Sequence, residues 1–173
     1  FNIYSMKHLL VGFFLLVAVA SFSQDKKKLD EKNGFRDDIF GAPIESYKTL
    51  VEVDKTKDGF QILYRKTDEN FSLGIIELSS VTYTFYKGKL DAILLSTKGY
   101  TNSRGVLDIL ISNYGNGYQS NRYIEDYFWF GKKVVMSYSE NSLTNDATIF
   151  IATKENDKEK ETDKKESIKK VKI

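Results

Sequence analysis

Cysteine is absent from this chain of 173 residues, and the only histidine is His8. Without thiols the protein has no disulfide, no thiolate metal site and no cysteine for a bacterial lipid anchor. His8 lies in a segment that we expect to be removed, so the mature protein would also lack imidazole ligands and histidine-activated nucleophiles. We therefore expect no metal and no cofactor, and catalysis would need carboxylates, lysine, tyrosine or a Ser–Lys pair.

The chain also has little proline and little net charge. Pro43 is the only proline and aromatic residues make up 14%, and both features favour a strand-rich domain. Twenty-six basic residues stand against 24 acidic ones, which leaves a net charge of +2. Nucleic-acid binding needs a strongly basic face, which this balance does not supply. We expect no nucleic-acid partner.

Residues 1–23 have the pattern of a cleavable secretory signal peptide with a start at Met6. A lysine follows Met6, residues 9–20 are uncharged and mostly apolar, and residues 21–23 place serine at the −3 and −1 positions of a cut before Gln24. The apolar run is much shorter than the roughly 20 residues of a membrane span. We therefore expect a periplasmic or extracellular protein of a Gram-negative-type bacterium, with no stable membrane anchor after cleavage.

Composition divides the mature chain into three parts. Residues 24–33 are polar and charged, which is typical of a flexible leader. Residues 34–153 carry the apolar periodicities of a single domain. Residues 154–173 alternate charges with almost no apolar side chain, so we expect a disordered tail, with a fraying helix as the alternative.

The domain has the pattern of an α+β fold: a single antiparallel sheet of hairpins with two short helices packed on one face. Pro43 suits the first turn of the first helix, and an apolar stripe predicts a second helix from Ser103 to a stop at Gly115. Strand-like runs between the helices cover residues 50–53, 60–64, 71–78, 81–86 and 89–96. A further hairpin and a strand at 148–152 follow the second helix.

The hairpin around Lys87-Gly88 predicts the faces of the sheet. This dipeptide suits a two-residue type I′ turn. In that register the pairs that face the core are Phe85 with Leu90, Tyr83 with Ala92 and Val81 with Leu94, and the opposite face is mainly polar. A slip by one residue would mix the two sets, because side chains alternate between faces.

The hairpin around Gly131-Lys132 suits a type II′ turn, which places Trp129 opposite Val134 and Tyr127 opposite Met136, towards the second helix. Phe128, Phe130 and Val135 then share the other face. If helices cover only one face of the sheet, these three residues form an interaction surface. If the leader or the first helix covers them, they belong to a second core.

The other motifs give no strong indication of a metal site or a catalytic site. Asp54 to Gly59 begins like a calcium loop, but Arg65 stands where that loop needs a glutamate. Glu125-Asp126 is a pair of adjacent acids, whose side chains point to opposite faces of a strand. A Ser–Lys motif, Ser167 to Lys170, lies within the charged tail. We identify no catalytic, cofactor-binding or metal-binding residue.

Three short motifs carry a resemblance to known proteins. The opening Gly34-Phe35-Arg36 to Phe40-Gly41, the hairpin Phe85 to Leu90 and the helix end Tyr114-Gly115 resemble small uncharacterised exported bacterial domains with a "GFR…FG" opening. The similarity covers about residues 34–153 and implies no activity. The helix-then-hairpin layout is also similar, at the level of fold alone, to outer-membrane-assembly small lipoproteins and β-lactamase-inhibitor-like domains. The missing lipid-anchor cysteine departs from the first of these.

Two functions of different classes follow from these patterns. The first is a non-enzymatic binding domain for a protein or small-ligand partner, favoured by the near-neutral charge and the aromatic surplus on one sheet face. The alternative is a hydrolase-type enzyme that uses carboxylates or a Ser–Lys pair. A shallow aromatic face would favour binding, whereas a deep pocket with convergent acids would favour the enzyme.

The signal-peptide pattern predicts where the chain is cut on export. Signal peptidase should cut before Gln24, because Ser21 and Ser23 suit the positions that the peptidase reads. N-terminal sequencing of the exported protein is expected to begin at Gln24. Recovery of exported protein that still begins at Met6 would contradict the prediction.

Overall fold

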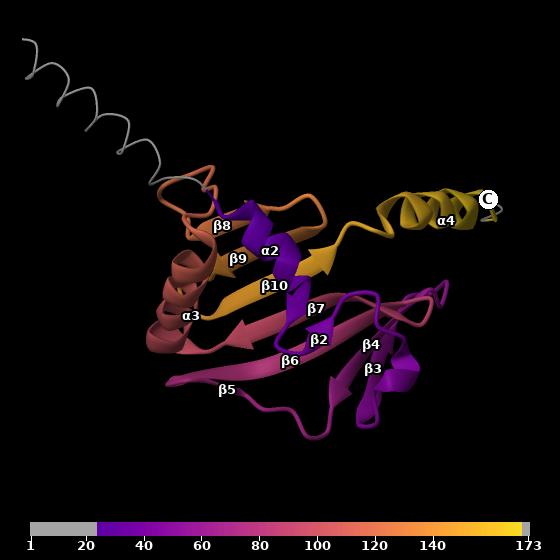
Figure 1. The fold of residues 1–173 in the computed structure, drawn as a ribbon, viewed down its shortest axis with the longest axis horizontal. Helices are drawn as coiled ribbons and strands as arrows, with labels where there is room; N and C mark the ends of the chain where they lie inside the picture. The colour runs from indigo at the N-terminus through magenta and orange to yellow at the C-terminus, as the bar shows by residue number, and fades with distance from the viewer. Residues whose placement is uncertain (1–23, 171–173) are drawn as a thin grey trace, which may run out of the picture.

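The computed structural model describes residues 24–170 (Figure 1), so the predicted signal peptide lies outside the described residues. Within this range no helix is long and apolar enough to cross a membrane. The elements, in chain order, are α2 (Lys26–Lys32), β1 (Gly34–Phe35), β2 (Asp38–Ile39), a 3₁₀ turn (Ile44–Ser46), β3 (Leu50–Lys55), β4 (Gln61–Lys66), β5 (Ser72–Leu73), β6 (Ile76–Tyr86), β7 (Lys89–Thr97), α3 (Gly99–Tyr114), β8 (Asp126–Phe130), β9 (Val134–Glu140), β10 (Ala147–Thr153) and α4 (Asp157–Lys170).

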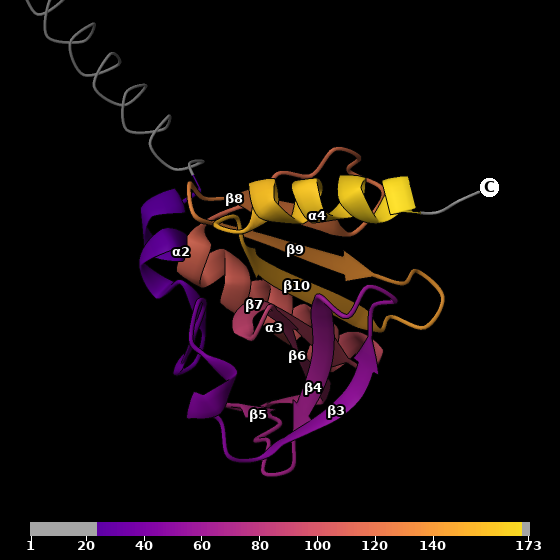
Figure 2. The same cartoon turned by 90° about the vertical axis from the view of Figure 1, so that its right-hand side faces the viewer.

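The predicted α+β class is confirmed. An antiparallel sheet has the strand order β3-β4-β6-β7-β10-β9-β8, with β5 paired to β6 and the short β1–β2 pair set apart. The helices α2 and α3 lie together, and α4 lies away from them across one end of the sheet (Figures 1 and 2). Since β10 inserts between β7 and β9, the two halves of the chain share one continuous sheet.

The core lies between the sheet and α3. Val106, Leu107 and Leu110 of α3 are buried, as the apolar stripe predicted. Gly105 of the same helix approaches the sheet so closely that a Cβ there would lie 2.1 Å from Ile76 Cδ1. The helix ends at Gly115, whose φ of 73° is one that glycine adopts readily and whose N–H bonds Ile111. Trp129 on β8 donates its indole N–H to the carbonyl of Gly115 at 2.8 Å, which fixes the end of the helix against the sheet.

The β6–β7 hairpin differs from the predicted register. The Lys87-Gly88 turn has positive φ at both positions, as expected, and Phe85 pairs with Leu90. A bulge then inserts Asp91, so that Ala92 pairs with Thr84 and Leu94 with Thr82. The predicted pairs of Tyr83 with Ala92 and of Val81 with Leu94 are therefore wrong. Ile93 and Leu95 pair with Tyr83 and Val81 instead and are buried in the core.

The β8–β9 hairpin also shifts, by two residues. Trp129 pairs with Met136 and Phe130 with Val135, not with the predicted partners. Because side chains alternate with a period of two, this shift leaves every residue on its predicted face. Trp129 and Met136 are buried against the helix side, and Phe128, Phe130 and Val135 share the opposite face.

Two segments ahead of the sheet differ from their predicted forms. The predicted flexible leader contains α2, whose N-cap Asp25 accepts a hydrogen bond from the backbone of Lys28. Leu29 of α2 is buried in the core, which explains why this polar segment orders. The helix predicted at Pro43 is only the 3₁₀ turn Ile44–Ser46, because the residues from Leu50 onward pair with β4.

Most of the charged tail forms the helix α4, Asp157–Lys170, which was the alternative to the expected disorder. Its contacts are polar. Lys160 Nζ lies 2.6 Å from Asp91 Oδ2. Asp163 accepts a hydrogen bond from the Tyr86 hydroxyl and pairs with Lys87. The side chain of Asp91 is only 2% exposed, and its carboxylate is paired with Lys160 and with the amide of Asn156.

This buried pair generates a stability prediction. Lys160→Met removes the cation that faces the Asp91 carboxylate, and we expect the free energy of unfolding to fall by about 1–3 kcal/mol. Urea unfolding at pH 7 measures the loss. Lys165→Met is the matched control, because Lys165 is 67% exposed and pairs only within α4, and it should change stability by less than about 0.5 kcal/mol. Equal midpoints for the two variants would contradict a stabilising role for α4.

Candidate functional site

The sheet face opposite α3 carries an apolar patch built by cross-strand pairing. Phe128 pairs with Ser137, Ser137 with Phe150, and Phe150 with Leu94, so that one row crosses β8, β9, β10 and β7. Phe130 and Val135 pair in the next row. We call Phe128, Phe130, Val135, Phe150 and Leu94 the open-face patch.

The open-face patch is accessible to solvent. Phe130 is 46% exposed and Phe150 is 41% exposed, while Phe128, Val135 and Leu94 are half-buried. The rings of Phe128 and Phe130 stack, with centroids 6.1 Å apart and an interplanar angle of 9°. The leader does not form a second core over these rings, because α2 packs beside α3 and places Leu29 in the main core. The patch is thus a group of partly exposed apolar side chains on one sheet face, and such surfaces often mark binding sites.

Polar residues border the patch along the strands. The adjacent row pairs Asp126 with Ser139, Ser139 with Thr148, and Thr148 with Ser96. The hydroxyl of Ser139 donates to Asp126 Oδ1 at 2.5 Å. An apolar centre with a polar rim resembles the composition of protein-binding surfaces.

Helix α2 holds the turn that carries Phe130. Asp30 Oδ1 accepts hydrogen bonds from the backbone N–H groups of Lys133 and Val134 at 2.8 and 3.0 Å, and Oδ2 accepts one from Lys132 at 2.7 Å. Gly131 is required by this approach, since a Cβ there would lie 2.2 Å from Asp30 Oδ1. Glycine at this position therefore allows Asp30 to approach the turn closely, and it does not form the type II′ turn that the sequence predicted.

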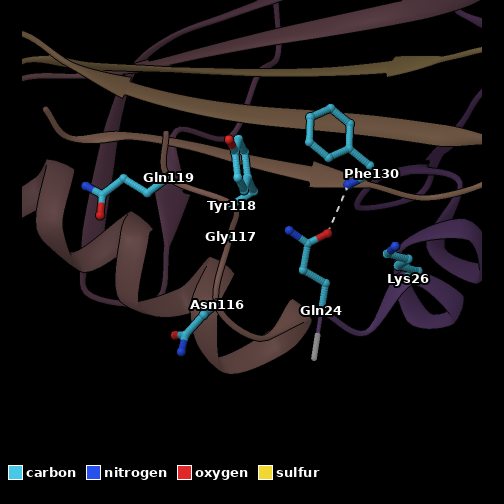
Figure 3. A pocket seen from close by; sticks show the side chains of 7 residues that line it. All are labelled: Gln24, Lys26, Asn116, Gly117, Tyr118, Gln119 and Phe130. Atoms are coloured by element: carbon cyan, nitrogen blue, oxygen red, sulfur yellow. Dashed lines mark hydrogen bonds between the residues drawn. The ribbon is translucent and has the colours of Figure 1, made fainter. Parts of the chain in front are cut away.

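Two residues from elsewhere in the chain form hydrogen bonds with the backbone groups on the free edge of β8. Tyr118 exchanges two backbone hydrogen bonds with Phe128, at 2.7 and 2.9 Å. The side-chain amide of Gln24 donates to the Phe128 carbonyl at 2.8 Å and accepts the Phe130 N–H at 3.3 Å (Figure 3). These contacts leave a pocket of about 760 Å³ between Gln24, Tyr118 and Phe130.

A group of charged and tyrosine side chains clusters around Arg104 on α3. Its guanidinium pairs with Glu125 at 2.8 Å and lies 3.1 Å from Glu140 Oε2, although the buried Nε–H is not aligned for a hydrogen bond there. Tyr138 donates to Glu140 at 2.6 Å and Tyr127 to Glu125 at 2.9 Å. The hydrogen bond from Arg104 lowers the pKa of Glu125. The carboxylate of Glu125 is thus held as an anion by Arg104, which opposes a role as general acid.

A second group joins the amino-terminal segment to the sheet. Lys66 contacts both carboxylate oxygens of Asp38 at 2.7 Å, and Arg36 pairs with Glu69 at 3.0 Å. Tyr83 donates to Glu69 at 2.6 Å, and burial followed by that hydrogen bond raises the pKa of its hydroxyl. Each charge has a partner of opposite sign, so the arrangement ties Asp38 to β4 and offers no free nucleophile.

The other sequence motifs are placed in ordinary structural roles. Asp58 of the calcium-like loop accepts hydrogen bonds from the Thr56 hydroxyl and the Phe60 N–H, at 2.6 and 3.0 Å. These bonds stabilise the turn of the β3–β4 hairpin. Ser167 and Lys170 lie on α4. Among residues 24–170 no group of three His, Cys, Asp or Glu side chains is placed to hold a metal ion.

Three components of the patch region were not predicted from the sequence. Leu94 was assigned to the core because the Asp91 bulge was not foreseen, and Phe150 was given no role. The alternation along β10, in which Ile149 and Ile151 are buried and Phe150 is exposed, was the available signal for Phe150. Gln24 could not be found, because only the fold brings it to β8.

A scan against protein-family models, a search of curated proteins and a search of solved structures each found no match to this chain. The resemblance to exported bacterial "GFR…FG" domains therefore stays a prediction.

The Asp30 contact generates a pH prediction. Partial burial opposes ionisation of Asp30, but the hydrogen bonds from Lys133, Lys132 and Val134 outweigh it and lower its pKa below the ordinary value. A lowered pKa in the folded state means that the contact stabilises the protein above about pH 4 and that this contribution is lost as the pH falls further.

Asp30→Asn removes that charge. Urea midpoints measured from pH 6 to pH 2 should show the parent more stable than Asp30→Asn at pH 6, with the difference shrinking below about pH 4. Glu31→Gln is the control, since the neighbouring Glu31 is exposed and forms only a loose pair with Lys27. A difference that stays constant over the whole range would contradict the assignment.

Proposed function

We propose that this protein is an exported, non-enzymatic binding domain whose interaction surface is the open-face patch. The observation that carries the proposal is the exposure of stacked and adjacent phenylalanine rings on a sheet whose other face is covered. Exposing Phe130 and Phe150 to water has a cost that a structural role alone does not explain. The partner is a protein or a ligand with an apolar surface.

The rigidity of the patch supports this proposal. Its side chains project from paired strands, and Asp30 and Gln24 hold the β8–β9 turn and the β8 edge by hydrogen bonds. A preformed surface loses little conformational entropy when a partner docks. Large rings with few rotatable bonds are also the residues that dominate binding free energies at interfaces.

The carboxylate clusters argue against the enzymatic alternative. Glu125 and Glu140 share Arg104, and Asp38 is paired with Lys66. Hydrolysis by two carboxyls needs one of them protonated near neutral pH, with both facing a cleft. The pKa of Glu125 is lowered by its bond to Arg104, which is the opposite direction.

A double substitution tests the proposal. Phe128→Ser with Phe130→Ser should leave the protein folded, with a stability loss below about 3 kcal/mol, because neither ring is fully buried. Affinity capture from periplasmic extract, analysed by mass spectrometry, should lose the partner that the parent protein retains. Tyr123→Ser is the matched control, since Tyr123 is an exposed ring outside the patch, and it should retain the partner. Unfolding of the double variant, or an unchanged set of captured species, would overturn the proposal.

A further inference from the structure

The pocket beside Phe130 has walls of two aromatic side chains. Tyr118 is 57% exposed and Phe130 is 46% exposed, and both line the hollow of about 760 Å³. Figure 3 shows the two rings on the same side of the pocket, with Gln24 between them and Asn116. An exposed aromatic ring offers a flat apolar surface with little conformational entropy to lose on binding.

The polar groups of the pocket are mostly amides. Gln24, Asn116 and Gln119 line it together with the ammonium of Lys26, and no acidic residue stands among its described lining residues. An amide presents a donor and an acceptor side by side. The three amides match adjacent hydroxyl groups, which both donate and accept hydrogen bonds, better than they match a carboxylate or a phosphate.

The walls of the pocket are held in place. Tyr118 is bound to β8 through its two backbone hydrogen bonds with Phe128. Gly117 packs on Trp129 so closely that a Cβ at residue 117 would lie 2.9 Å from the indole ring. Gln119 donates its side-chain amide to the Ile124 carbonyl at 2.8 Å, which fixes the following loop. The backbone of Tyr118 and the amide of Gln119 are therefore positioned before any ligand binds.

From these features we propose that the pocket binds an uncharged saccharide. A pyranose ring has an apolar face of C–H groups that packs on Tyr118 and Phe130, and a rim of hydroxyls that reach Asn116 and Gln119. The open, shallow form of the pocket suits a chain of sugars more than a small enclosed ligand. This inference deepens the proposed binding function and rests on it, because Phe130 belongs both to the open-face patch and to the pocket.

Titration with defined oligosaccharides tests the inference. The exported protein is titrated with cellohexaose, maltohexaose and chitohexaose by calorimetry, with ¹H–¹⁵N spectra recorded in parallel. We expect at least one of these neutral probes to bind with a dissociation constant on the order of 10⁻⁴ M and to shift the amide signals of residues 116–119. Tyr118→Ala should weaken that binding about tenfold.

Control variants separate the pocket from the open-face patch. Tyr123→Ala and Phe150→Ala should leave saccharide binding unchanged, because neither residue lines the pocket. If Phe150→Ala weakens binding and Tyr118→Ala does not, the sugar lies on the open-face patch, which overturns the pocket but keeps the proposed binding function. Binding of a sulfated oligosaccharide alone would show that Lys26 selects anions and would overturn the neutral class. No shift with any probe at about 10 mM would overturn the inference outright.

Discussion

The buried carboxylate of Asp91 links the register of β7 to the position of α4. Asp91 is the extra residue of a bulge, so each later residue of β7 faces the side opposite to the one it would face without the bulge. Ile93 and Leu95 therefore lie in the core, and Leu94 belongs to the open-face patch. A carboxylate that is 2% exposed needs a cation, and Lys160 of α4 supplies it. The position of the terminal helix and the composition of the open face therefore have one physical origin.

The amino-terminal segment completes the β8 side of this sheet. Asp30 of α2 bonds the backbone of the β8–β9 turn, and Gln24 satisfies the edge of β8. An unsatisfied edge strand would invite pairing with another chain. With the turn and edge occupied, the proposed binding surface consists of side chains: the rings of Phe128 and Phe130 and the neighbouring Tyr118. The amino-terminal segment thus determines which parts of β8 stay exposed.

Sequence reasoning succeeded where a periodic pattern suffices. The faces of Phe128, Phe130 and Val135 were predicted although the register was shifted, because a shift by two preserves alternation. The bulge was not predictable, since the polar partner Asn156 lies 65 residues from Asp91 in the sequence. The helix α2 was missed for a similar reason: a polar segment orders around one buried residue, Leu29, whose contacts exist only in the fold.

The open-face patch is a preformed surface in contact with water. Carbene footprinting of the folded protein, read out by mass spectrometry at single residues, measures this directly. We expect strong labelling of Phe130 and Phe150 and weak labelling of Trp129 and Phe85, which are almost fully buried. Labelling of Phe130 and Phe150 at the low level of Trp129 would show that this face is covered in solution, and the open-face patch would then not be a binding surface.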